Sequence, residues 1–176
     1  MVDANVFAIK KLAKELEGRW LVTTDINKSD LGVSAGLAEP GNYYKWTVIF
    51  EGPRDSLYEG GMFTAILEFP NDYPVRPPTM RFVTKMWHPN IHEDGKVCIS
   101  ILHPAEHDRF NEQERLDEKW RPVLGVQEIL ISVISMLNDP NTDSPANVDA
   151  SIEYRTNIEG YRKKVRVLVR ESLENC

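Results

Sequence analysis

The sequence has few cysteines and no long apolar run. Its two cysteines, Cys98 and Cys176, cannot staple a domain of this size, so a reducing compartment is expected. No stretch approaches the roughly 20 apolar residues that a membrane span needs. The opening segment, MVDANVFAIKKLAKEL, carries charges inside its apolar stretches, unlike a signal peptide. We therefore expect an intracellular protein, cytoplasmic or nuclear or both, without a membrane span of its own.

An excess of basic residues is also missing. The chain has 21 Lys and Arg against 27 Asp and Glu, a net charge of −6. Binding of nucleic acid irrespective of its sequence requires a basic surface that displaces counterions, so this class is excluded. A hydrophobic content of 41% with 27% charged residues is ordinary for a soluble globular protein. At 176 residues, the chain is expected to fold as a single domain, 1–176, and a monomer is the default expectation.

The apolar pattern changes its period along the chain. Val6–Leu16 has helical spacing, with Asp3 as a candidate N-cap and Gly18 as a stop. Alternation and turn residues then predict four strands, at Val33–Ala38, Tyr43–Glu51, Met62–Phe69 and Thr79–Thr84. Helical patterns return at Val126–Leu137, after a cap at Asn147, and at Glu159–Leu173. The predicted fold class is α+β: a four-stranded antiparallel β-meander flanked by an N-terminal helix and C-terminal helices.

The segment between the strands and the last helices contains Cys98, which allows three interpretations. A free cysteine often behaves as a small, inert, buried hydrophobe. It can also ligate a metal, since four histidines lie nearby: His88, His92, His103 and His107. Zinc sites usually have paired ligands such as Cys-x-x-Cys, which are absent, and Pro89 keeps the first histidine pair off one helical face. We therefore predict no metal site.

The third interpretation is a nucleophile, because the thiolate is the reactive form of cysteine. His88 or His92 could serve as its base, but their order in the sequence places neither ring beside the sulfur. The phosphatase arrangement of Cys and Arg separated by five residues is missing, since position 104 is Pro. Spacing alone leaves the question open.

Several motifs in register resemble the ubiquitin-conjugating enzyme family. His88-Pro89-Asn90 is followed by Cys98 eight residues beyond Asn90, like the active-site signature of that family. The other matching motifs are Tyr58-Glu59-Gly60-Gly61 with Phe63, Phe69-Pro70, Tyr73-Pro74-x-x-Pro77-Pro78, Trp120-x-Pro122 and Asp139-Pro140-Asn141. The resemblance covers about residues 4–173. It implies the ubiquitin-conjugating fold and a transferase that holds its modifier as a thioester.

The resemblance also implies a role for each residue of the active-site signature. Cys98 matches the cysteine that accepts ubiquitin from an activating enzyme. Asn90 matches the asparagine that steadies the oxyanion, or the loop around it, and such amide donors contribute about 10²–10³ in rate; a purely structural turn residue is the alternative. His88 and Pro89 are expected to support the active-site loop. No cofactor is expected, since the activating enzyme is the partner that uses ATP.

Two departures from the family pattern point to a subgroup. Ser100 and Ser144 stand where many members carry acidic residues, and seventeen residues separate Leu102 from Trp120 where common members have few. This insertion, 103–119, carries six acids: Glu106, Asp108, Glu112, Glu114, Asp117 and Glu118. It resembles members that build degradation-signalling polyubiquitin chains, either of the cell-cycle type that serves cullin-based ligases or of the endoplasmic-reticulum type. We hypothesise that these carboxylates orient or deprotonate the incoming lysine; a solvated loop is the alternative.

Partner surfaces follow from the same resemblance. The activating enzyme is expected at Lys10, Lys11 and Lys14, and a RING-type or cullin-based ligase at Val75, Lys119, Pro122 and Val123. A donor ubiquitin is expected at Ile131 and Ser135, where an outward-facing apolar residue could equally be core. Protein substrates complete the expected partners. Two rival functions are a conjugating enzyme for another ubiquitin-like modifier and a non-catalytic ubiquitin-binding scaffold.

Overall fold

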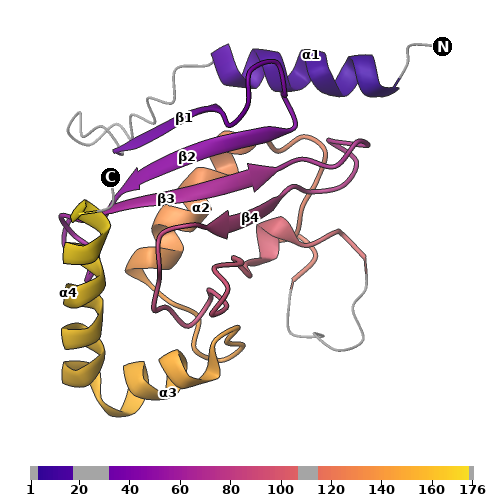
Figure 1. Cartoon of the computed structure of the whole chain (residues 1–176). Coiled ribbons are helices and arrows are strands. Elements are labelled where there is room, and N and C mark those ends of the chain that lie inside the picture. Colours follow the sequence, from indigo (N-terminus) through magenta and orange to yellow (C-terminus); the bar gives the residue numbers. More distant parts are fainter. Residues whose placement is uncertain (1–3, 18–31, 107–114, 175–176) are drawn as a thin grey trace.

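A computed structural model describes residues 4–17, 32–106 and 115–174 (Figure 1). The predicted helix ends at Asp3 and Gly18, nearly all of the loop 19–32, and Cys176 lie outside the described residues. Within them, no helix has both the length and the apolar character needed to cross a membrane.

Four antiparallel strands form one sheet in the order β1-β2-β3-β4, which confirms the predicted meander. The strands are β1 (Val33–Leu37), β2 (Lys45–Glu51), β3 (Met62–Glu68) and β4 (Thr79–Phe82). Each pairs with its neighbour in sequence, for example Val48 with Ala65 between β2 and β3. Short connections favour this arrangement because antiparallel neighbours can be joined by tight turns.

One face of the sheet forms the main hydrophobic core. Alternate residues of β2, namely Trp46, Val48 and Phe50, are fully buried, while the residues between them are partly exposed. The helix α2 (Val126–Asn138) buries Val126, Ile129 and further apolar residues in the same core cluster, and in Figure 1 it lies behind the sheet. Burial of each large apolar side chain contributes about 1.5–3 kcal/mol.

The other helices lie around the sheet (Figure 1). The first, α1 (Ala4–Glu17), runs beside the end of the sheet that begins with β1, and α3 (Val148–Thr156) and α4 (Ile158–Glu174) follow α2. The sequence predicted all four helices to within a few residues. Asn147 caps α3 as expected: its side chain accepts a hydrogen bond of 3.0 Å from the Ala150 backbone N–H.

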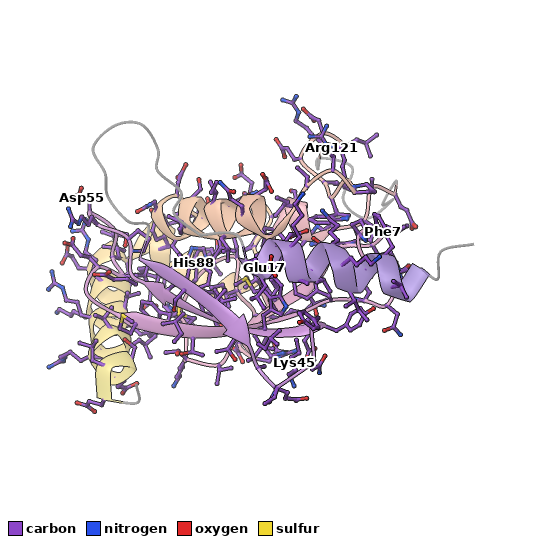
Figure 2. The ribbon with its side chains drawn as sticks, turned by 90° about the horizontal axis from the view of Figure 1, so that it is seen from above. Phe7, Glu17, Lys45, Asp55, His88 and Arg121 are labelled. Atoms are coloured by element: carbon purple, nitrogen blue, oxygen red, sulfur yellow. The ribbon has the colours of Figure 1, made fainter. Side chains whose placement is uncertain are left out.

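Glu15 connects α1 to the rest of the domain. Its carboxylate accepts hydrogen bonds from the Tyr73 hydroxyl and the Val126 backbone N–H, both at 2.9 Å. Burial and the nearby Glu15 charge raise the pKa of Tyr73, so its hydroxyl stays protonated and donates. The residue after Tyr73 is held as well, because the Trp120 indole N–H donates a hydrogen bond to the Pro74 carbonyl. Figure 2 shows Phe7 of α1 and Arg121 toward the same end of the molecule.

Among the described residues between β4 and α2, regular structure is limited to one 3₁₀ turn, η1 (Ser100–Leu102). Isolated bridges fix the path of the chain, pairing Ile91 with Val97 and Arg81 with Lys96. Gly95, at the turn, has φ +89, and a side chain there would collide with the Phe82 carbonyl, which only glycine avoids. Cys98 follows this turn, with its N–H bonded to the Asn90 carbonyl at 3.0 Å.

Candidate active site

The segment before Cys98, which we call the buried turn (residues 86–91), is locked into the fold. His88 is 0% exposed. One ring nitrogen, Nε2, lies 2.9 Å from the Met136 carbonyl, and Nδ1 accepts a bond from the Asn90 N–H. Burial lowers the pKa of His88 to about 4, so the ring is neutral and donates from Nε2 to Met136. With both nitrogens engaged in this way, His88 supports the turn and is not placed to act as a base for Cys98.

Asn90 braces the buried turn against the loop after α2. It is 3% exposed, and its amide bonds both backbone groups of Asn141: Nδ2 donates to the carbonyl and Oδ1 accepts from the N–H, each at 2.8 Å. An amide nitrogen has two protons, so the brace uses one of them. The backbone of Pro89 adds to the contact by accepting from the N–H groups of Ala146 and Asn147.

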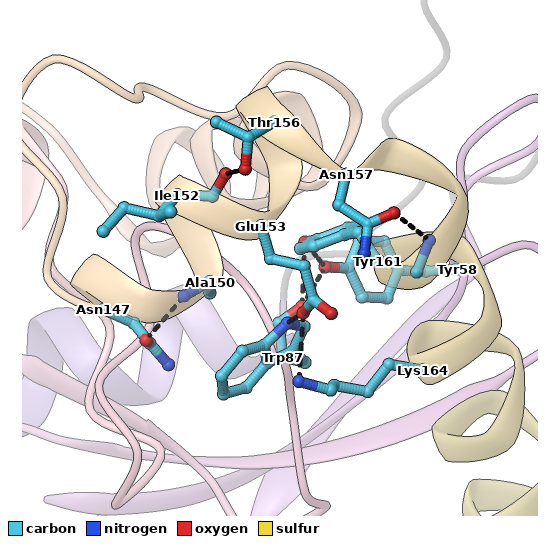
Figure 3. A network of polar contacts seen from close by, with 11 residues as sticks. Tyr58, Trp87, Asn147, Ala150, Ile152, Glu153, Thr156, Asn157, Tyr161 and Lys164 are labelled. Atoms are coloured by element: carbon cyan, nitrogen blue, oxygen red, sulfur yellow. Dashed lines mark hydrogen bonds and ion pairs between the residues drawn. The ribbon is translucent and has the colours of Figure 1, made fainter.

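A polar network holds the buried turn from the side of α3 and α4 (Figure 3). The Trp87 indole N–H donates to Glu153 at 2.7 Å, and the Lys164 ammonium bonds the same carboxylate at 3.0 Å. Lys164 also lies 3.7 Å from the centre of the Trp87 ring, a cation–π contact. The Trp87 carbonyl accepts from the hydroxyls of Tyr58 and Tyr161. Burial is the main cause that raises the pKa of Tyr58 and of Tyr161.

Cys98 lies half-buried in a cleft of about 350 Å³, which we call the cysteine cleft. Its other lining residues come from the buried turn, η1, the segment before Trp120, α2 and the loop after α2: Asn90, Ile99, Ser100, His103, Glu118, Met136, Asp139, Asn141, Asp143 and Ser144. The thiol is therefore accessible from a polar cleft, which contradicts the interpretation of Cys98 as an inert core residue. Asn141 holds the loop after α2 in shape where it lines the cleft, since its side chain accepts a hydrogen bond of 2.9 Å from the Asp143 N–H.

His103 is the imidazole beside the sulfur. Its Nε2 lies 3.5 Å from Sγ of Cys98. The backbone of His103 is held at both sides, because its N–H bonds the Ser100 carbonyl at 2.9 Å and its carbonyl accepts from Trp120 N–H at 3.0 Å. Neither histidine considered from the sequence as a base has this position: His88 is committed to the backbone, and His92 is exposed and lines a different depression.

The acidic insertion contributes one described carboxylate to the cysteine cleft. Glu118 lines the cleft, as do Ser100 and Ser144, while Glu106 and Asp117 are exposed outside it. Asp117 is paired with Arg115, and this exposed ion pair lowers the pKa of Asp117. The other predicted acids, Asp108, Glu112 and Glu114, lie outside the described residues, as does His107. Two more cleft carboxylates, Asp139 and Asp143, come from the loop after α2.

The predicted partner residues are mostly on the surface. Val75, Pro122 and Val123 are exposed, Val123 by 81%, and so are Lys10, Lys14, Ile131 and Ser135. Lys11 instead forms an ion pair with Glu15 at 2.9 Å, and so also supports the docking of α1. Lys119 contradicts the prediction of a ligase contact: it is 2% exposed and its ammonium donates to the Glu106 carbonyl. The Lys119 side chain is therefore buried, and its ammonium helps to hold the insertion in place.

The metal-binding interpretation of the histidines has no support from the described residues. In the ranges 4–17, 32–106 and 115–174, no three His, Cys, Asp or Glu side chains gather closely enough to hold an ion. His88 in particular points both ring nitrogens at backbone groups of its own fold.

Three ionisable residues of the cleft, His103, Asp139 and Asp143, were not predicted from the sequence as part of the active site. His103 was considered only as a metal ligand, and Asp139 and Asp143 only as part of a motif or as neighbours of Ser144. A signal for His103 existed, since it follows Cys98 by five residues, but the 3₁₀ turn that brings the ring back to the sulfur has no distinctive composition. The two aspartates flank Asn141, which Asn90 anchors beside the cleft, and this contact joins segments about 50 residues apart.

Comparison with known proteins agrees with the fold and the cleft. Residues 11–169 match the family described as ubiquitin-conjugating enzyme. The chain is 52% identical over 143 residues to ubiquitin-conjugating enzyme E2 15 of Schizosaccharomyces pombe, covering 81% of this chain and 85% of that protein. It is 53% identical to ubiquitin-conjugating enzyme E2 14 of Arabidopsis thaliana, with the same coverage, and 51% identical to E2 7 of that plant, covering 81% and 86%. All three are relatives by similarity alone.

The chain belongs to the ubiquitin-conjugating enzyme family. Its activity is that of a ubiquitin transferase, and membership implies ubiquitin, an activating enzyme and a ligase as its partners.

Proposed function

We propose that Cys98 carries ubiquitin as a thioester and passes it to lysines of other ubiquitin molecules, with a RING-type or cullin-based ligase, building chains that signal proteasomal degradation. The observation that carries this proposal is the composition of the cysteine cleft. The thiol shares that cleft with the braced Asn90 and with three carboxylates, Glu118, Asp139 and Asp143.

The carboxylates suit an incoming lysine. A lysine arrives as an ammonium and must lose a proton before its nitrogen can attack the thioester carbonyl carbon. Carboxylates attract the ammonium, and desolvation in the cleft favours the neutral amine. Glu118 is the contribution of the acidic insertion to this set, at a site where Ser100 and Ser144 replace the acids of many family members. The thioester supplies the driving force, so positioning is the main task of the protein.

The ligase and donor surfaces of the proposal rest on exposure. Val75, Pro122 and Val123 are exposed apolar or proline residues, and we propose that they receive the ligase. Ile131 is 40% exposed on α2, and with Ser135 it offers a surface for the donor ubiquitin. Lys10 and Lys14 of α1 remain available to the activating enzyme.

The test separates loading from transfer. Glu118→Gln should load ubiquitin at the wild-type rate but form free chains about tenfold more slowly, because loading needs no lysine in the cleft. Glu106→Gln is the matched control: the same change in the same insertion, outside the described cleft lining. Chain formation is followed after the activating enzyme is stopped, so that only preloaded protein reacts. Equal chain rates for Glu118→Gln and wild type, or equal slowing of loading and transfer, would exclude the proposed role.

A further inference from the structure

A contact with the sulfur sets His103 apart from the other described histidines, and its backbone is firmly anchored. Its Nε2 is 3.5 Å from Sγ of Cys98, a distance at which an S–H group and an imidazole nitrogen form a hydrogen bond. Its backbone is fixed by bonds at both its N–H and its carbonyl, and η1 immediately precedes it. The pair is therefore a built feature of the cleft and not a chance approach of a surface side chain.

The charges around the pair show why a partner for the sulfur is needed. The described residues that line the cleft include Glu118, Asp139 and Asp143 from two different segments, and none of them is Lys or Arg. The ammonium of Lys119, which follows Glu118 in the sequence, donates to the Glu106 carbonyl. Negative surroundings disfavour a bare thiolate but favour a protonated imidazole. A thiolate in this cleft is therefore best accommodated as an ion pair with an imidazolium.

We propose that His103 is a catalytic base that takes the Cys98 proton when ubiquitin is loaded. The proton moves from Sγ to Nε2, and the thiolate attacks the carbonyl carbon of the ubiquitin thioester carried by the activating enzyme. A new S–C bond to Cys98 forms, the S–C bond to the activating enzyme breaks, and the departing thiolate takes up a proton from His103 or from water. This step deepens the proposed function, because it assumes that Cys98 is the residue loaded.

His103 then has a different part in the second step. Once Cys98 is acylated, no S–H remains to be deprotonated, and the lysine nitrogen is the attacking atom. His103 is therefore needed for loading at neutral pH and is not needed to activate the lysine. Glu118, in contrast, is needed for the attack of the lysine and not for loading. An experiment can therefore separate the roles of the two side chains.

The first test uses the free full-length protein and needs no ubiquitin. The rate of alkylation of Cys98 by iodoacetamide is measured against pH, and mass spectrometry of the peptide containing Cys98 distinguishes it from Cys176. An unassisted thiol is only a few per cent thiolate at about pH 7. His103→Gln should therefore react about tenfold more slowly than wild type near neutral pH, and the two rates should converge at about pH 9, where thiols ionise unaided.

The matched control is His92→Gln, which removes an exposed imidazole outside the cysteine cleft and should follow the wild-type profile. Melting temperatures verify that both variants fold, and added imidazole should partly restore the His103→Ala rate. Even without variants, a wild-type profile identical to that of a free cysteine peptide would overturn the proposal.

Single-turnover loading from the activating enzyme completes the test. Loading of His103→Gln should be slowed about tenfold near neutral pH and recover in more alkaline buffer. If wild type loads ubiquitin and His103→Gln shows the same pH profile, the base assignment is wrong while the proposed function stands. If wild type never loads on Cys98, the proposed function itself fails. The alkylation result then judges the proton transfer alone.

Discussion

The residues on the two sides of Cys98 differ in almost every physical respect. In the buried turn before it, the side chains of His88 and Asn90 bond backbone groups, and His88 is neutral and 0% exposed. The cysteine cleft is lined mainly by half-buried or exposed residues, with Asn90 and Met136 as its buried members. The buried turn contains His88, and the cysteine cleft contains His103. Burial and partners, not residue type, decide that the first is structural and the second can exchange protons.

The difference has a mechanical meaning. A rigid turn keeps the thiol at a fixed place relative to α2, because His88 is bonded to Met136 and Asn90 to Asn141. An open cleft lets ubiquitin and lysine reach the thiol. Changes in the buried turn should therefore act mainly on stability, and changes in the cleft mainly on rates.

The largest expected effect concerns His88 and pH. Its folded pKa of about 4 lies below the ordinary value near 6.5, so the unfolded state binds the proton first as pH falls. Its contribution to stability is complete above the ordinary value, and about 3 kcal/mol is lost as pH falls from about 6.5 to about 4. We expect the free energy of unfolding of wild type to fall that much more than that of His88→Gln over this range. Chemical denaturation at several pH values measures it. Parallel curves for the two proteins would show that His88 titrates normally.

The next effect concerns the two hydrogen bonds between the Asn90 side chain and the Asn141 backbone. Asn90→Ala leaves the Asn141 N–H and carbonyl without their partners, and we expect a loss of about 2 kcal/mol in stability together with slower ubiquitin transfer. Thermal or denaturant unfolding and single-turnover discharge measure the two. Asn138→Ala, an exposed asparagine at the end of α2, should cost less than about 0.5 kcal/mol. If both variants were equally stable, the hydrogen bonds of Asn90 to Asn141 would contribute nothing to the stability of the fold.

A smaller effect is expected behind the buried turn. Lys164→Met keeps the stem but removes the cation from the Trp87 ring and from Glu153, which should lower stability by about 1 kcal/mol because the site is partly solvated. Lys163→Met, on the same helix and exposed, is the control. The difference between the two should shrink in high salt. A salt-independent difference would point to packing in place of charge.

The smallest effect on stability is expected in the cleft. Ser100→Ala and Glu118→Gln change exposed or half-buried side chains of the cysteine cleft, so the free energy of unfolding should change by less than about 0.5 kcal/mol, while Glu118→Gln slows chain formation. Denaturant unfolding beside the chain assay measures this. A stability loss as large as that of Asn90→Ala would remove the contrast between the two sides of Cys98.

The regular elements were predictable from the sequence because each has a pattern of its own. The alternation of Trp46, Val48 and Phe50 identifies a strand with one buried face, and Asn147 marks the start of a helix. The family motifs identified Asn90 and Cys98 as active-site residues. The position of His103 was not predictable, since a short 3₁₀ turn decides it. Lys119 was misjudged because a lysine is normally exposed, and only the tertiary structure shows that the Glu106 carbonyl accepts a hydrogen bond from its ammonium.

The most direct test of the central claim is the chemistry of the ubiquitin adduct at position 98. The protein is incubated with ubiquitin, its activating enzyme and ATP, and wild type, Cys98→Ser and Cys98→Ala are compared with and without reducing agent. The account predicts an adduct that reductant cleaves in wild type, a reductant-resistant oxygen ester in Cys98→Ser, and none in Cys98→Ala. A reductant-sensitive adduct that persists in Cys98→Ala, or no adduct in wild type, would contradict it.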